Sequence, residues 1–294
     1  MIKIGVIGKG CIGSYITYLL QDQNTSVFVR NPSQTNPQIV ISDKQHKILG
    51  TQLALTQDNL HQIDLLIIPI KSYQNDTLIQ QLLPILHPST ELLILQNGIH
   101  WLTQYANAFP HNPILGGIVT DGLFKQSKDT IVLAGQGELI LGALKGANQK
   151  SLAPLIHAHQ NAQWVEDLQP FIYKKLLINI VINSLTFLYQ CKNGELKDYP
   201  EQVAALKKEV LQTYLALGII DSTAQLASVV ENVIESTQHN RSSMLQDRLA
   251  KAPSEVDAIL GCLLEKAKAA KIPTPLMSCY LDKIKTIERQ YVTA

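Results

Sequence analysis

The segment GKGCIG at residues 8–13 restricts the possible folds of this chain more than any other feature. It follows the short β-branched run IKIGVI and precedes a predicted helix at residues 11–22. The order strand, tight turn and helix makes this G-x-G-x-x-G pattern typical of a dinucleotide-binding domain. We expect Gly8 to permit the turn, Gly10 to let a pyrophosphate approach the backbone, and Gly13 to let the helix pack closely on the sheet.

The first helix and the second strand indicate how a cofactor would be bound. Backbone N–H groups around Cys11 and Ile12, with Lys9 beside them, would face phosphates at the positive end of the helix. The alternative is a glycine cluster in a purely structural turn. Arg30 ends the second predicted strand, SVFVR, where an NAD-binding domain would carry Asp or Glu. A guanidinium fits a 2′-phosphate, so we predict NADP(H) in preference to NAD(H), with a solvated arginine as the alternative.

The first half of the chain alternates between strand and helix signals. Near-continuous apolar runs at residues 64–70 and 91–96, separated by a helical stretch, predict central strands of a parallel sheet. Short apolar segments at 39–41 and 52–55 are expected to form an antiparallel or irregular addition, and three strands from 112 to 142 a β-rich edge. This alternation predicts a Rossmann-like α/β domain, which we assign to residues 1–167.

The second half of the chain follows the helical period. Pro170 is suited to the start of a long helix, which places the domain boundary near it. The sequence therefore predicts an all-α domain at residues 168–294. Including one helix before the boundary, the expected helices lie at 150–160, 170–189, 201–217, 222–236, 254–270 and 275–290.

Polar residues follow two of the predicted parallel strands. Lys71 comes after one of them, and Asn97 and Gly98 come after the next. Carboxyl ends of strands in such sheets line the ligand crevice, so Lys71 and Asn97 are candidates for cofactor contact. The alternatives are a surface charge for Lys71 and an ordinary Asn-Gly turn for Asn97.

A polar stripe interrupts the apolar segment KKLLINIVINSLTFLY at residues 174–189. Lys175, Asn179 and Asn183 are spaced four apart, so at about 100° per residue they share one face of a helix. A buried amide without a partner costs about 1–3 kcal/mol, so the stripe must bind either other parts of the protein or a ligand. A solvated charge at Lys175 and amides bonded to neighbouring helices remain alternatives.

Composition excludes several classes of function. A net charge of +1 gives no electrostatic case for nucleic acid, and 46% hydrophobic with 17% charged residues indicates a globular protein. The four cysteines lack CxxC spacing, so we expect reduced thiols and no metal site. No uninterrupted apolar run reaches the roughly 18 residues of a membrane span, which favours a cytoplasmic protein. His157 and His159 are expected as ordinary surface residues.

Further polar candidates occur in three segments of the second half. Asn193 lies in CKNGEL, Asn240 with Ser242 and Ser243 lies in HNRSSMLQD, and Glu255 opens SEVDAILG. Together with GKGCIG, Lys71, QNG and KKLLINIVIN, these segments resemble the 2-dehydropantoate 2-reductase (ketopantoate reductase) family. The resemblance runs from Met1 to the last helix. The residues alone leave alternatives open. Glu255 is equally explained as an acid in the first turn of a helix that Ser254 caps, and Ser242 and Ser243 as the start of a helical turn.

The resemblance implies a role for each matching position. Lys175 would be the general acid that protonates the ketone oxygen. The substrate would be held by Asn179, Asn183, Asn193, Asn240 and Ser243, with Ser242 beside them. The cofactor would be contacted, or the site ordered, by Lys71, Asn97, Glu255 and, as a weaker match, Gly122.

The expected activity is NADPH-dependent reduction of ketopantoate to (R)-pantoate, a step towards pantothenate and coenzyme A. Lysine supplies the electrophilic assistance, so no metal is required. The alternatives are a reductase of another branched 2-oxo acid and an NADPH-binding regulator without turnover. The expected partner is the small-molecule substrate, and the assembly is either a monomer or a homodimer.

Overall fold

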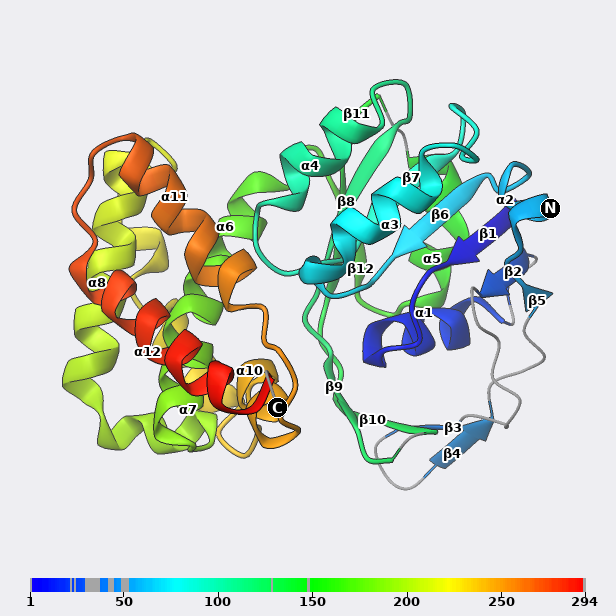
Figure 1. The fold of residues 1–294 in the computed structure, drawn as a ribbon. Helices are drawn as coiled ribbons and strands as arrows, with labels where there is room; N and C mark the ends of the chain where they lie inside the picture. Colours follow the sequence, from blue (N-terminus) through cyan, green and yellow to red (C-terminus); the bar gives the residue numbers. More distant parts are fainter. Residues whose placement is uncertain are drawn as a thin grey trace. The chain divides into compact units, whose positions relative to one another are not determined.

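The computed structural model describes residues 2–21, 23, 25–29, 38–41, 45–48, 53–127, 129–146 and 149–292. Arg30, the residue predicted to select NADP(H), lies outside this described part. The chain forms two compact units, drawn in Figure 1. The first comprises Met1–Gln96 and Trp101–Leu168, and the second Asn97–His100 and Gln169–Ala294. The sequence alone assigns residues 97–100 to the first domain, whereas here this short segment packs with the second unit.

The first unit is built on a sheet that has eight strands in the described residues, in the order β12-β11-β8-β7-β6-β1-β2-β5. The strands from β5 to β8 run parallel, β11 runs antiparallel to β8, and β12 pairs parallel to β11. This is the order of a doubly wound sheet, which confirms the Rossmann-like α/β domain predicted from the alternation of strands and helices. The strand bounds are β1 Ile2–Val6, β2 Thr25–Val29, β5 Leu53–Ala54, β6 Leu65–Ile68, β7 Glu91–Ile94, β8 Ile114–Val119, β11 Leu139–Lys145 and β12 Ala162–Val165.

A smaller sheet has the strand order β4-β3-β10-β9. Its strands are β3 (Gln38–Ile41), β4 (Gln45–Ile48), β9 (Gly122–Lys125) and β10 (Thr130–Gly135). The expectation for the segments 39–41 and 52–55 is therefore half wrong. The former joins the small sheet through β3, but the latter forms β5 on the edge of the main sheet by pairing in parallel with β2.

Both faces of the main sheet are buried, as parallel sheets require. On one face, α1 (Cys11–Leu20) and α5 (Ala153–Ala158) pack on Ile4, Val6 and other apolar strand residues. Strand residues whose side chains point to the other face of the sheet, such as Leu66, are also fully buried. Figure 1 shows α3 (Asn75–Leu82) and α4 (Trp101–Ala108) against the sheet, and α2 is the short helix Gln57–Leu60.

Helices make up the second unit. Its α-helices are α6 Gln169–Ile178, α7 Ser184–Tyr189, α8 Pro200–Ala216, α9 Val229–Ser236, α10 Ser243–Leu249, α11 Cys262–Ala269 and α12 Pro275–Val292. Two π-helical segments interrupt them, Asn179–Asn183 between α6 and α7, and Asp257–Gly261 before α11. No signal in the sequence predicts either one.

The helix Gln169–Tyr189 has a mean hydropathy of 1.4 and is long and apolar enough, by these measures alone, to cross a membrane. Within the most apolar 18 residues of this helix, 61% is buried inside the protein. Burial of this kind is what a core helix of a globular protein shows, and the same helix carries the polar stripe. Its hydropathy therefore follows from its place in the core of the second unit.

Candidate functional site

The glycine turn has the geometry that the motif predicts. Gly8 has a φ of +130°, a conformation that residues with a side chain rarely adopt. A Cβ on Gly13 would lie 1.9 Å from the carbonyl oxygen of Gly8, so the approach of α1 to the turn requires glycine there. A Cβ on Gly10, in contrast, would meet nothing within 4 Å.

The start of α1 is suited to an anion. Gly10 is the N-cap residue of this ten-residue helix, and no side chain caps it. Lys9 and Gly10 are exposed, and Cys11 and Ile12 are partly buried. Backbone N–H groups at an uncapped helix start carry a partial positive charge, so this turn has the features that bind a phosphate group.

Two other predicted cofactor residues follow strands of the same sheet. Lys71 is partly buried, comes shortly after β6, and is the N-cap residue of the 3₁₀ turn Ser72–Gln74. Gly122 begins β9, shortly after β8 ends at Val119. Because β6 and β8 run parallel to β1, both residues lie beyond the carboxyl ends of strands, on the side of the sheet where the glycine turn follows β1.

The expectation that His159 is a surface residue is wrong. His159 is 2% exposed, and its Nε2 lies 2.9 Å from Oδ2 of Asp121, with both side chains almost completely buried. The backbone N–H of Asn161 donates to Nδ1 of the same ring, so Nε2 carries the proton and donates to Asp121. The other carboxylate oxygen accepts from the backbone of Gly137 at 3.0 Å. This pair stabilises the turn that precedes Gly122.

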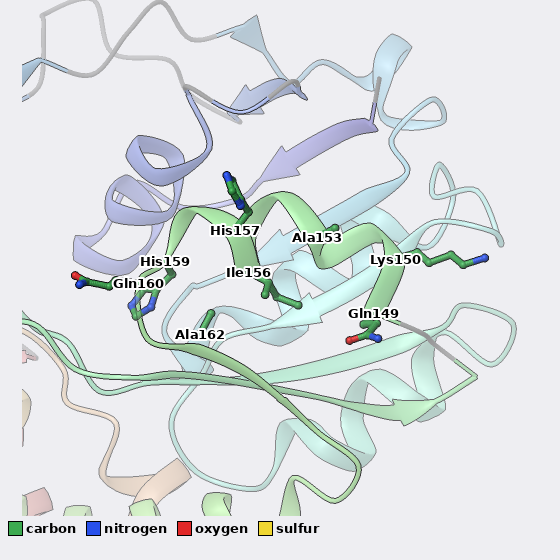
Figure 2. A pocket seen from close by; sticks show the side chains of 8 residues that line it. All are labelled: Gln149, Lys150, Ala153, Ile156, His157, His159, Gln160 and Ala162. Atoms are coloured by element: carbon green, nitrogen blue, oxygen red, sulfur yellow. The ribbon is translucent and has the colours of Figure 1, made fainter.

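A pocket of about 630 Å³ lies in the first unit, beside α5. Figure 2 shows that its lining comes from the turn before α5, from α5 itself and from the residues that lead into β12. No residue predicted for the cofactor or the substrate lines it, and the ring of His159 is already bonded to Asp121.

Lys175 lies in the last turn of α6 and is partly buried. Burial lowers the pKa of Lys175 to about 8, while the negative charge of Glu255 opposes part of this shift. An ammonium group with such a pKa is mostly protonated at neutral pH yet releases its proton much more readily than an ordinary lysine. The neighbouring Lys174 is exposed.

Asn97, Glu255 and Asn179 form a connected group in the second unit. Asn97 donates from Nδ2 to Oε2 of Glu255 at 2.9 Å, and Asn179 donates from Nδ2 to Oδ1 of Asn97 over a long 3.5 Å. Glu255 is only 5% exposed, so this hydrogen bond stabilises a buried carboxylate. Gly98 permits the arrangement, since it has a φ of +80° and a Cβ there would lie 1.9 Å from the carbonyl oxygen of Ala258.

Asn183 pairs with Ser243 rather than with the group around Asn97. Its Nδ2 donates to the Ser243 hydroxyl at 3.3 Å. The sequence places Asn183 on one α-helical stripe with Lys175 and Asn179, but residues 179–183 form a π-helix. A π-helix bonds i to i+5, so the α-helical spacing assumed from the sequence does not hold between Asn179 and Asn183.

Ser242 and Asn193 are engaged within the protein. The Ser242 hydroxyl caps α10 by accepting from the backbone of Leu245 and also bonds Thr186 at 2.7 Å. Asn193 is buried and donates from Nδ2 to Thr237 at 2.8 Å, while its Oδ1 has no hydrogen-bond partner among the described residues. Asn240 is exposed, and its carbonyl accepts from the backbone of Asn193. These contacts hold together the turns on which Asn240 and Ser243 lie.

The described residues contain no group of three or more His, Cys, Asp or Glu side chains arranged to hold a metal ion. All four cysteines have free thiols. Sequence reasoning missed the buried Asp121 and His159 pair and a buried amide at Asn75. A polar residue directly after an apolar strand was the only signal for Asp121, and nothing in the sequence connects it to His159.

Comparisons with known proteins cover almost the whole chain. The family model described as ketopantoate reductase PanE/ApbA matches residues 4–146, and that of its C-terminal part matches residues 167–288. The chain is 30% identical to the 2-dehydropantoate 2-reductase of Vibrio cholerae, with 99% of this chain and 100% of the relative covered.

Two solved structures are similar over a comparable length. A probable 2-dehydropantoate 2-reductase from Bacillus subtilis is 26% identical, with a TM-score of 0.81 and coverage of 97% of this chain and 100% of the other. A D-mandelate dehydrogenase, determined with NADH and anilino(oxo)acetate, has a TM-score of 0.87 with 99% of both chains covered. At 20% identity, the latter shows a shared fold only.

Proposed function

Because the chain belongs to the ketopantoate reductase family, we propose that it catalyses the NADPH-dependent reduction of ketopantoate to (R)-pantoate. This reaction leads to pantothenate and coenzyme A. The observation that carries the proposal is Lys175, a partly buried lysine whose pKa is lowered to about 8, in the same unit as Asn97, Asn179 and Glu255.

The glycine turn supports the cofactor assignment. The open space at Gly10 and the uncapped start of α1 suit a pyrophosphate, with Lys9, Cys11 and Ile12 beside it. Lys71, Gly122, Asn97 and Glu255 are the further residues that we propose to contact the cofactor or to order the site. When bound, NADPH supplies the hydride that adds to the C2 ketone.

Lys175 performs the acid step. Its ammonium group stabilises the negative charge that develops on the ketone oxygen and donates the proton that completes the alcohol. Burial favours the neutral product form of the amine, whereas the charge of Glu255 favours the ammonium form that starts the next cycle. The opposing effects leave a group that gives up a proton and regains one near neutral pH.

Asn179, Asn183, Asn240 and Ser243 are proposed to bind the substrate. The Ser243 hydroxyl accepts from Asn183, which leaves its own O–H available to donate to the substrate carboxylate. The amides bind hydroxyl and carboxylate groups without adding charge. We propose a supporting role for Asn193 and Ser242, since the Asn193 Nδ2 and the Ser242 hydroxyl are bonded within the protein.

An assay of NADPH oxidation with ketopantoate and a panel of other 2-oxo acids tests the activity. The panel includes the branched acid 2-oxoisovalerate and the aromatic acid phenylglyoxylate, so that the assay compares 2-oxo acids of different shape. We expect the highest kcat/KM with ketopantoate. A higher value with another acid would transfer the assignment to that substrate, and tight NADPH binding without turnover of any would indicate a regulator.

The preference for NADPH is proposed from Arg30. Replacing Arg30 with Glu removes the partner of the 2′-phosphate and adds repulsion, so KM for NADPH should rise about tenfold or more while KM for NADH changes little. Steady-state kinetics with both cofactors measure this. Lys125→Glu makes the same charge change at an exposed residue of β9 and should leave both constants unchanged. Equal effects of Arg30→Glu on the two cofactors would contradict the assignment.

We also propose that the protein acts in the cytoplasm, where its substrate and NADPH are small soluble molecules. The homodimer remains a proposal, which light scattering of the purified protein tests directly.

A further inference from the structure

Asn75 is a buried amide at the first residue of α3, and it is only 1% exposed. All four hydrogen-bonding positions of its side chain are used. Its Nδ2 donates to Gln96 Oε1 at 3.0 Å and to Gln104 Oε1 at 2.9 Å. Its Oδ1 accepts from Gln96 Nε2 at 2.7 Å and from the Tyr105 hydroxyl at 2.9 Å. A side chain this completely satisfied has one orientation, and it orients its neighbours in turn.

Gln96 and Tyr105 are buried as well, and Gln104 donates onward to Asp76 at 2.7 Å. We call Asn75, Gln96, Gln104 and Tyr105 the amide network. It connects three parts of the first unit: the start of α3, the connection after β7 at Gln96, and α4. Removing one member leaves each of its partners short of at least one hydrogen bond, which is costly where the partner is buried, so the network resists local change in these three parts.

Each end of the amide network is next to a residue that we propose to contact the cofactor or to order the site. Asn75 directly follows the 3₁₀ turn that begins after Lys71, in which Gln74 N–H donates to the Lys71 carbonyl at 3.0 Å. Gln96 is covalently followed by Asn97. Strands β6 and β7 are parallel neighbours, paired at Ile68 and Ile94, so both connections leave the same edge of the sheet.

We propose that Asn75 and Gln96 are positioning residues for cofactor binding, which hold Lys71 and the backbone at Gln96, to which Asn97 is joined, at the carboxyl edge of the sheet. Neither acts on the substrate. The inference rests on the proposed function for its choice of ligand, but it concerns binding of NADPH and not turnover.

Asn75→Leu tests the inference, because leucine has a similar volume and removes all four hydrogen bonds. NADPH binding is measured by the change in its fluorescence, and thermal unfolding gives Tm. We expect Kd for NADPH to rise about tenfold or more and Tm to fall by roughly 5 °C. If Asn75→Leu does not fold, Gln96→Leu, which leaves the bonds of Asn75 to Gln104 and Tyr105, provides the same comparison.

Asn112→Leu is the matched control. Asn112 is also a buried amide of the first unit, 5% exposed, and its Nδ2 donates to the carbonyls of His87 and Thr90 at 2.9 Å. It precedes β8, at the opposite end of the strands from Lys71. Its Tm should fall by a similar amount with Kd within about twofold of the wild type.

The outcomes separate the inference from the proposed function. If Asn75→Leu and Gln96→Leu lower Tm as Asn112→Leu does and leave Kd within twofold, the amide network is structural only and the inference is overturned. If the wild type binds NADPH but does not reduce ketopantoate, the proposed function fails, while the binding comparison still decides the role of the network.

Discussion

Replacing Lys175 with alanine is expected to lower kcat by about 10²–10⁴-fold, the usual effect of losing a general acid, while Kd for NADPH changes little. The variant loses the group that stabilises the developing alkoxide and protonates it. Stopped-flow or steady-state kinetics with ketopantoate measure kcat, and a fluorescence titration measures Kd. Wild-type turnover in Lys175→Ala would remove Lys175 from the mechanism.

The pH dependence gives a second measurement of the same group. The acid step requires the protonated amine, and the pKa of Lys175 is about 8, so wild-type kcat should be constant below this value and fall as pH rises through it. The residual activity of Lys175→Ala should lack that alkaline decline. Lys174→Ala is the matched control, because Lys174 is exposed and adjacent residues of a helix point about 100° apart. It should keep both kcat and the pH profile.

Gly98→Ala is expected to have the largest effect on stability, lowering the free energy of unfolding by about 3 kcal/mol or more. Two costs combine there, a φ of +80° and a Cβ placed 1.9 Å from the carbonyl oxygen of Ala258. Relief of the overlap must move the backbone next to Asn97, so the hydrogen bond from Asn97 to Glu255 should be lost and KM for NADPH should rise. Denaturant titration and steady-state kinetics measure the two effects.

Gly218→Ala separates the two costs at Gly98. Gly218 has a φ of +65°, and a Cβ there would meet nothing within 4 Å. Its replacement should therefore cost only about 1–2 kcal/mol for the left-handed conformation and leave KM unchanged. Equal destabilisation in the two variants would show that the segment around Gly98 moves away from Ala258 without cost.

The polar stripe shows how far helical periodicity can predict a site. It correctly groups Lys175 with Asn179 in one helix, and Asn179 bonds Asn97. It assumes α-helical spacing from Asn179 to Asn183, whereas this segment is a π-helix that departs from 3.6 residues per turn, and Asn183 bonds Ser243 there. Periodicity assumes an α-helix and cannot detect such an interruption.

Histidine 159 and Asn75 show a different limit. Both are polar residues in segments without a motif, and the sequence alone makes a surface position reasonable for each. Each is buried because its partner is supplied by a distant part of the chain, Asp121 for His159, and Gln96 and Tyr105 for Asn75. The free energy of burying a polar group depends on that partner, which the local sequence does not contain.

The sequence by itself determined the doubly wound sheet, the helical second half and the glycine turn, because each depends on local spacing of apolar residues and glycines. Only the tertiary structure decided which polar side chains meet. Asn97 and Glu255, 158 residues apart in the chain, are joined by one hydrogen bond, and the segment 97–100 packs with the second unit and not the first. Contacts of this kind depend on how packed elements bring distant residues together, and no local pattern encodes them.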